Sequence, residues 1–128
     1  MPKATARLEL PYLPPVQLSP NWPPRRQGSY YVSRRVKDKL QQDTAMAAKA
    51  AGLRPMGKVL ISVTFVVADH RRRDGDNWLI RLKASWDSLV KLGILKDDSS
   101  EFVSFAPVQF EVNKSQAPRT IIRIEEEP

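Results

Sequence analysis

The alternation of apolar and polar residues predicts a β-sheet built from four strand segments. Residues 6–10 and 119–124 alternate with the period of a half-buried strand, and residues 58–67 contain the most apolar run, rich in β-branched side chains and suited to the centre of a sheet. Residues 102–112 also have strand character, but Pro107 lacks a backbone donor and favours an edge position or a bulge. The pattern therefore predicts a small sheet with one interrupted strand.

Two further segments, residues 30–51 and 78–92, have the apolar spacing of amphipathic helices. Ser29 is suited to cap the first helix, and Gly52 and Gly93 are suited to end the first and the second. The order is then strand, helix, strand, helix, strand, strand. It predicts an α+β fold in which all 128 residues form a single domain, a small mixed β-sheet with two helices packed on it.

A proline-rich loop, residues 11–28, separates the first strand from the first helix, and its prolines exclude regular structure. A loop of this length in a compact domain is usually functional or disordered. It carries Asn21, Trp22, Arg25 and Arg26, and an arginine beside an aromatic ring can hold a phosphate or stack on a base. A packed surface loop anchored by Trp22 is the alternative.

The excess of basic charge lies in the first half of the chain. The net charge is +7; residues 1–58 contain 11 Lys and Arg against 3 Asp and Glu, whereas residues 59–128 contain 10 against 11, including an acidic tail at residues 125–128. A basic half and a carboxylate-bearing half suit a polyanion partner, and a basic surface that only aids solubility fits equally well. The basic residues of the first helix face either DNA or solvent: Arg34, Arg35, Lys37, Lys39 and Lys49.

Composition excludes several kinds of site. The chain has no cysteine, which excludes disulfides and thiolate sites, and His70 is its only histidine, which excludes zinc triads and serine–histidine relays. There is no glycine-rich phosphate loop, and a calcium loop starting at Asp74 would lack its glycine and its glutamate. Because no apolar run approaches about 18 residues and no signal peptide is present, we expect no membrane partner and a cytoplasmic location.

The stretch Asp69–Asn77 places three arginines and three aspartates between the central strand and the second helix. Asp74 and Asp76 lie two residues apart, so an extended backbone points both carboxylates to one side, where they repel unless a cation compensates. A neighbouring arginine or a bound divalent metal can supply that cation. Oxygen ligands select hard ions, which favours magnesium or manganese.

The second helix carries a stripe of residues spaced four, three and four apart: Asp76, Ile80, Lys83 and Asp87. Lys83 therefore projects from the same side as Asp76, and Asp87 can pair with it one turn later. A second acidic pair, Asp97 and Asp98, follows the helix. On its own this pair is an ordinary polar turn, but with Asp74 and Asp76 it completes the three carboxylates that a hydrolytic magnesium site needs.

Three motifs in this order resemble the RusA family of Holliday-junction resolvases. The chain reads RRRDGDN, then KASWDSL, then GILKDD. In the family, an arginine-rich run precedes two aspartates and an asparagine. A lysine with an aspartate four residues further on follows, and a glycine, an apolar pair and two adjacent aspartates close the pattern. The resemblance covers about residues 59–112 well and the segment Leu18–Asn21 loosely.

The resemblance implies a homodimer of phage or bacterial type, in the cytoplasm, that nicks four-way DNA junctions symmetrically by magnesium-dependent phosphodiester hydrolysis, with manganese as the alternative ion. The implied metal-binding catalytic acids are Asp74, Asp76 and Asp98. Lys83 is the implied catalytic lysine, and Asp87 and Asp97 are candidate supporting residues. The predicted DNA contacts are Arg71, Arg72, Arg73, Asn21, Arg25 and Arg26.

The chain departs from the family's best-known form at the lysine, which there lies four residues after the second aspartate. Here Ile80 occupies that position and Lys83 lies seven residues after. Both positions stay on the aspartate's face, at about +40° and about −20°, but one turn apart. The last aspartate raises a distance problem as well. A helix over residues 77–92 is about 23 Å long, so residues 93–98 must run back along it, or Asp98 must serve a site in trans.

Two other functions fit the same residues. The chain can be a non-catalytic nucleic-acid-binding protein whose acids are structural partners of the arginines. It can also be a nuclease that acts on flaps or other branched DNA instead of four-way junctions. Magnesium dependence of cleavage on a synthetic junction distinguishes the first alternative from a nuclease.

Overall fold

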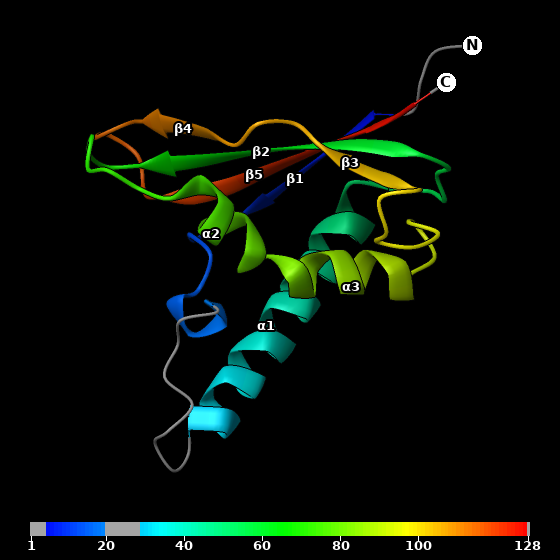
Figure 1. Ribbon diagram of the computed structural model, residues 1–128, viewed down its shortest axis with the longest axis horizontal. Helices are drawn as coiled ribbons and strands as arrows, with labels where there is room; N and C mark the ends of the chain where they lie inside the picture. Colours follow the sequence, from blue (N-terminus) through cyan, green and yellow to red (C-terminus); the bar gives the residue numbers. More distant parts are fainter. Residues whose placement is uncertain (1–4, 20–28, 128) are drawn as a thin grey trace.

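The structure is a computed structural model that describes residues 5–19 and 29–127 (Figure 1). It confirms the predicted α+β fold with a small mixed sheet. The elements in chain order are β1 (Thr5–Leu10), η1 (Val16–Leu18), α1 (Ser29–Ala50), β2 (Val59–Val67), α2 (Gly75–Ile80), α3 (Lys83–Lys91), β3 (Val103–Phe105), β4 (Gln109–Val112) and β5 (Arg119–Glu126).

The strand β2 is the centre of the sheet. It pairs antiparallel with β5 on one side and parallel with both β3 and β4 on the other, and β1 pairs antiparallel with β5. Pro107 lies between β3 and β4, where its missing N–H cannot support a continuous ladder. The predicted interruption of this edge at Pro107 is confirmed.

The helices lie on one face of the sheet, and the core fills the space between the two layers (Figure 1). Every second residue of β2 from Val59 to Val67 points into this core, and none of them is more than 1% exposed. In β5, Ile122 and Ile124 are fully buried beside them. The period of two thus places one apolar face of the sheet against the helices. Two of the intervening positions of β2, Ser62 and Thr64, line a pocket on the sheet together with Arg7 of β1 and Arg123 of β5.

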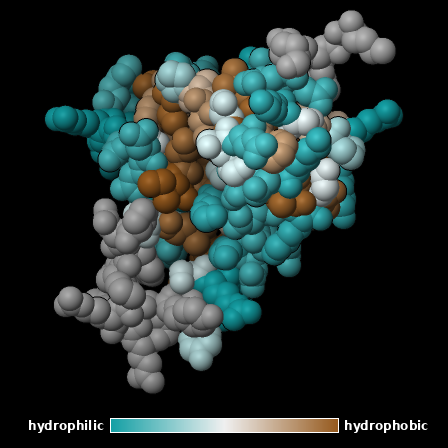
Figure 2. All heavy atoms as spheres, turned by 45° about the vertical axis from the view of Figure 1, so that its right-hand side comes forward, coloured by the Kyte–Doolittle hydropathy of each residue, from teal (hydrophilic) through white to brown (hydrophobic). Residues whose placement is uncertain are grey.

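Several large apolar side chains stay on the surface, and Figure 2 shows a band of hydrophobic residues among mostly hydrophilic ones. Among the described residues, the large apolar or aromatic side chains that are exposed, wherever they lie on the surface, are Val16, Tyr31, Val32, Met46, Ile80, Leu92 and Phe105. Single exposed apolar residues are common in folded proteins. The exposure of Ile80, at 53%, is therefore not by itself a sign of a functional site, and its neighbours must be considered.

The prediction of one helix over residues 78–92 is wrong, because the helix is interrupted after Ile80 and restarts at Lys83. Leu82 has φ −92° and ψ 7°, and the backbone bonds around it span three residues instead of four. The interruption lets Trp78 pack against Phe65 and Phe110 while Leu82 enters the core fully buried. Tertiary packing on two sides of the segment thus divides it into α2 and α3.

The last strand is longer than predicted and includes part of the expected acidic tail. β5 continues to Glu126, whose carboxylate accepts a hydrogen bond of 2.9 Å from the backbone N–H of Gly57. The N–H of Glu127 also donates to the carbonyl of Lys58 at 2.8 Å. These bonds tie the end of β5 to the segment that leads into β2.

The helices α1 and α3 end in the same way, at Gly52 and Gly93, which have φ of +68° and +77°. At each end, the glycine N–H and the N–H of the next residue bond carbonyls three and five residues back. This is the Schellman motif, which reverses the chain through a left-handed residue. After Gly93 the buried residues Ile94 and Leu95 follow, and the carbonyl of Ile94 accepts a bond of 2.8 Å from the N–H of Met56. The segment that leads to Asp98 is therefore anchored.

A buried pair of hydroxyl groups joins α1 to α3. The Oγ atoms of Thr44 and Ser85 lie 2.8 Å apart, and both residues are fully buried. Thr44 donates its proton to the carbonyl of Leu40 at 2.8 Å, so Ser85 is the donor between the two hydroxyls. Ser88 adds a bond of 2.8 Å to the carbonyl of Gln41. These bonds fix the position of α3 on α1.

Replacing Thr44 by valine should destabilise the fold, because it keeps the shape but leaves the buried Ser85 hydroxyl without an acceptor. We expect Thr44→Val to lower the free energy of unfolding by about 1–3 kcal/mol, measured by urea denaturation. The double variant Thr44→Val/Ser85→Ala should lose less free energy of unfolding than the two single variants together, because the unpaired hydroxyl is no longer present. Thr5→Val, at an exposed position of β1, is the control. Fully additive losses would contradict the coupling.

Replacing either helix-ending glycine by alanine should cost a similar amount. An added Cβ meets nothing within 4 Å at Gly52 or at Gly93, so only the left-handed backbone opposes it. We expect Gly93→Ala and Gly52→Ala each to lower the free energy of unfolding by about 1–2 kcal/mol in urea titrations. A negligible loss for Gly93→Ala beside a clear loss for Gly52→Ala would show that the reversal before Asp98 does not depend on glycine.

Candidate functional site

Lys83 brings together three of the residues that the sequence singles out. It is the first residue of α3, and its Nζ lies 3.6 Å from Asp87 Oδ1 and 3.6 Å from Asp98 Oδ2. The lysine side chain is 70% exposed, so screening by water leaves each ion pair little effect on stability. The arrangement therefore orients a cation between two carboxylates more than it supports the fold.

Asp98 reaches Lys83 within one chain, whereas its service to the site of Asp74 and Asp76, in cis or in trans, stays a prediction. Because the predicted helix is divided, α3 has nine residues and a length of about 13.5 Å instead of about 23 Å. The reversal at Gly93 then directs the following residues back along α3. The neighbouring Asp97 accepts a bond of 2.8 Å from the N–H of Asp98 and so shapes the turn.

The other two predicted metal ligands lie at the start of α2. Asp74 caps this helix by accepting a bond of 3.2 Å from the N–H of Asn77, and Asp76 stands in the first turn. Both aspartates are exposed. The Asn77 side chain accepts a bond of 3.2 Å from the Ser19 hydroxyl, which ties the end of η1 to this helix. The loosely similar Leu18–Asn21 segment thus approaches the acidic motif through its described residue Ser19.

The glycine between the two aspartates has a packing reason. A Cβ added at Gly75 would lie 3.3 Å from the Cβ of Val108 and 3.5 Å from the ring of Phe110. The distance to Val108 is shorter than an ordinary van der Waals contact, whereas the distance to Phe110 is an ordinary one. A small residue therefore lets the start of α2 lie close to the β4 edge of the sheet.

The donor chemistry of Asp74, Asp76 and Asp98 fits a hard divalent cation, since all three are exposed carboxylates. The arrangement does not gather them. Across residues 5–19 and 29–127, no three His, Cys, Asp or Glu side chains form a group that could hold a metal ion. The ammonium of Lys83 instead lies beside both Asp87 and Asp98. The metal site consequently stays a prediction.

The arginine run is largely turned toward Asp69, a partner that the sequence did not single out. Arg73 Nη2 and Arg71 Nη2 lie 2.6 and 3.2 Å from the two carboxylate oxygens of Asp69. The backbone N–H of Arg71 and the two guanidinium groups together hold the pKa of Asp69 well below its usual range. Arg73 also donates to the carbonyls of residues 69 and 71, so it shapes the loop before Asp74. Arg72 is exposed, with no ion pair to the described residues.

Trp78 anchors the junction from inside. Its ring packs edge-on against Phe65 and Phe110, with ring centroids 5.2 and 5.5 Å away. The guanidinium groups of Arg73 and Arg81 lie 5.8 and 5.4 Å from the Trp78 centroid. Burial lowers the pKa of Arg81 from its ordinary value. The aromatic cluster thus fixes α2 on the sheet and holds two of the cations near it.

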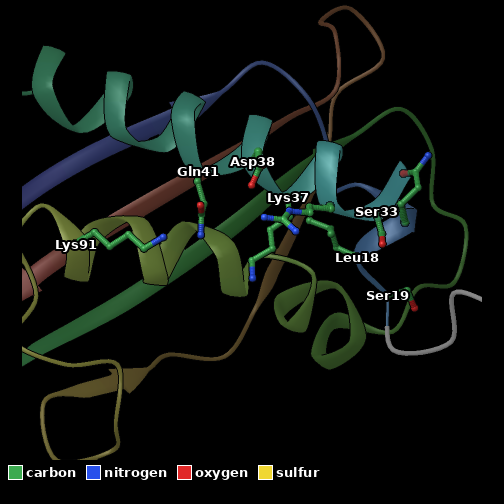
Figure 3. Close-up of a pocket in the computed structure, with 9 residues that line it drawn as sticks. Leu18, Ser19, Ser33, Lys37, Asp38, Gln41 and Lys91 are labelled. Carbon is green, nitrogen blue, oxygen red and sulfur yellow. The ribbon is translucent and has the colours of Figure 1, made fainter. Parts of the chain in front are cut away.

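A groove lies between η1, α1 and the α2–α3 segment. Its larger compartment has a volume of about 530 Å³, and Figure 3 shows Gln41 from α1 and Lys91 from α3 extending into the space between the helices. A second compartment of about 340 Å³ is lined by Ile80 and Lys83. Leu18 and Lys37 line both compartments, so the two are adjacent. We call these two adjacent compartments together the helix groove.

The basic residues of α1 differ in their surroundings, which the sequence alone could not show: some line the helix groove and others do not. Arg34 and Lys37 line the groove. Lys39 instead pairs with Asp43 at 2.6 Å, and Asp43 also accepts a bond of 2.6 Å from the Tyr12 hydroxyl. Burial and this bond raise the pKa of Tyr12. Burial opposes ionisation of Asp43, but the bonds from Lys39 and Tyr12 outweigh it and lower its pKa.

Three predicted DNA contacts, Asn21, Arg25 and Arg26, lie outside the described residues. Within the described part, no helix is long and apolar enough to cross a membrane. No protein-family model matches the chain, and no curated protein matches it either. Any function assigned to the chain therefore rests on its motifs and on the arrangement of its side chains.

Proposed function

We propose that the chain is a structure-specific endodeoxyribonuclease that hydrolyses phosphodiester bonds in four-way DNA junctions. The observation that carries this proposal is the return of Asp98 to Lys83, with the two charged atoms 3.6 Å apart. The RusA-like motifs KASWDSL and GILKDD are separate in the sequence, yet their lysine and their last aspartate meet in space. A functional cluster explains this meeting better than stability does, because the pair is exposed.

In the proposed reaction, Lys83 neutralises a non-bridging oxygen of the scissile phosphate. Asp87 and Asp98 orient its ammonium. A magnesium or manganese ion held by Asp74, Asp76 and Asp98 would activate water and offset the charge that develops on the phosphate. Arg72 and the cations of the helix groove would hold backbone phosphates on either side.

The symmetry of a four-way junction makes a homodimer the natural form of such an enzyme, because two strands must be cut. We propose a cytoplasmic homodimer that acts in a bacterial or phage-infected cell. Flaps and other branched DNA remain alternative substrates, since the same chemistry applies to them.

A non-catalytic DNA-binding protein is the second candidate, and one observation favours it. Asp69 is a structural partner of two arginines, and Asp87 and Asp98 are partners of Lys83. If all the acids serve in this way, the chain binds DNA without cutting it. Cleavage experiments separate the two candidates.

The proposed chemistry predicts that Lys83 and Asp98 are needed for cleavage and not for binding. Lys83→Ala should lower the cleavage rate of a synthetic four-way junction in magnesium at least 100-fold, because a transition-state contact of this kind contributes about 2.7–4 kcal/mol. Asp98→Asn should abolish cleavage while binding stays equal or strengthens, since a negative charge near phosphate is lost. Rates come from gel assays on matched four-way, flap and duplex substrates.

Glu101→Gln is the matched control, because Glu101 is an exposed carboxylate three residues beyond Asp98. It should cleave like the unchanged protein. If junctions are bound but never cut with magnesium or manganese, the non-catalytic candidate is correct. If Asp98→Asn cuts normally, Asp98 has no part in the site.

Metal binding can be measured without any cleavage. We expect magnesium to raise the melting temperature of the protein by mass action, and to give a binding isotherm in titration calorimetry. The double variant Asp74→Asn/Asp76→Asn should lose both signals, because each change removes an ionised oxygen ligand. Glu101→Gln should retain them. An unaltered isotherm in the double variant would place the ion elsewhere.

A further inference from the structure

The two compartments of the helix groove differ in character. In the larger one, Lys37 of α1 and Lys91 of α3 both line the space, together with polar side chains such as Gln41, which extends from α1 on the side of Lys91 (Figure 3). In the smaller one, Leu18, Ile80 and Ala84 form an apolar wall, and the charged lining consists of Lys37, Arg81, Lys83 and Asp87, which pairs with Lys83. A cationic compartment thus lies next to a more apolar one.

Two cations of the larger compartment, Lys37 and Lys91, are available to an anion. Lys37 and Lys91 form no ion pair with the residues that the structure describes, unlike Lys39, which is neutralised by Asp43. Among the residues that the structure describes, Asp38 is the one acidic side chain that lines this compartment. Positive charge concentrated between two helices attracts a polyanion, and its effect is larger in a groove than on a flat surface.

The apolar compartment requires a ligand with an apolar face. Ile80 is 53% exposed and lies at the position where the RusA-like pattern has a lysine, so a cation is replaced by a side chain that phosphate does not bind. The compartment volumes of about 530 and 340 Å³ lie in the range of small-molecule pockets, about 300–1,000 Å³. Each can accept a nucleotide-sized group.

We propose that the helix groove binds an unpaired DNA strand, with phosphates along Lys37 and Lys91 and one base against Ile80, and directs that strand to Lys83. In a duplex the base faces are stacked and cannot enter the apolar compartment, whereas an unpaired strand offers both a phosphate and a free base face. The inference rests on the proposed function for the identity of the polymer. It adds that the recognised part of the substrate is a strand that is unpaired at the branch point, either in a flap or where base pairs of a four-way junction open.

The test measures binding without metal, so it does not depend on cleavage. Fluorescence anisotropy in EDTA would compare a short oligothymidylate, an abasic oligomer of the same length and a blunt duplex. We expect the unchanged protein to prefer the oligothymidylate. Lys37→Gln should weaken both single strands and reduce the slope of log K against log salt by about 0.7, the value for one phosphate contact. Ile80→Ser should weaken the oligothymidylate roughly fivefold or more and leave the abasic oligomer unchanged.

Two matched controls come from α1. Lys49→Gln removes another exposed lysine from the same helix, and Met46→Ser removes an apolar side chain that is 69% exposed. Both should bind like the unchanged protein, and circular dichroism checks that every variant is folded. Equal losses for Lys37→Gln and Lys49→Gln would overturn the groove as the path of the strand. If Ile80→Ser weakens binding of the abasic oligomer as much as binding of the oligothymidylate, the base contact is overturned. It is also overturned if the unchanged protein does not prefer single strands to duplex.

The outcomes also separate this inference from the proposed function. Tight, groove-dependent binding of single strands by a protein that never cleaves would overturn the nuclease and leave the groove intact. Metal-dependent cleavage that Lys37→Gln and Ile80→Ser do not alter, together with unaltered binding, would overturn the groove alone.

Discussion

The parallel pairing of β3 with β2 is the constraint on which the arrangement of the site depends. Two strands that run in the same direction cannot be joined by a tight turn, so the chain needs a crossover between them. That crossover runs from residue 68 to residue 102 and contains Asp74, Asp76, Lys83 and Asp98. Because the core face of the sheet must be covered, the crossover is folded against it as α2 and α3. The candidate residues are thus exposed positions on a connection whose inner side is held by the core.

The crossover is fixed at several points, and each depends on a different interaction. The carboxylate of Asp69 binds Arg73 at its beginning, and the ring of Trp78 attaches α2 to the sheet. The buried hydroxyls of Thr44 and Ser85 attach α3 to α1. The left-handed Gly93 then turns the chain back. Rigid attachment on one side and exposed charge on the other is the arrangement that a site for a charged polymer needs.

Local sequence patterns predicted most of the helices and strands but not the tertiary contacts between them. Alternation predicted the strands, and the interruption at Pro107 followed from its missing donor. The division of the second helix could not be predicted, because it follows from the contact of Trp78 with Phe65 and Phe110, which are distant in sequence. Gly93 was recognised as a helix end, but the direction of the chain after it depends on the burial of the next residues and on a backbone bond from Met56. Ion-pair partners were the least predictable feature, since Asp69 binds Arg71 and Arg73, two of the arginines that the sequence predicted as DNA contacts.

The interruption between α2 and α3 also changes how the departure from the RusA-like pattern is understood. On a continuous helix, Ile80 and Lys83 would differ by a turn in height and only one could serve the site. With Ile80 ending α2 and Lys83 beginning α3, both side chains line the same compartment. The apolar residue at the family's lysine position then does not exclude a lysine from that space, because Lys83 enters it from the next helix while Asp87 and Asp98 hold its ammonium. With the lysine three residues later in the sequence, the apolar Ile80 lies beside it in the same compartment. An apolar surface next to a cation suits a ligand that has both exposed bases and phosphates.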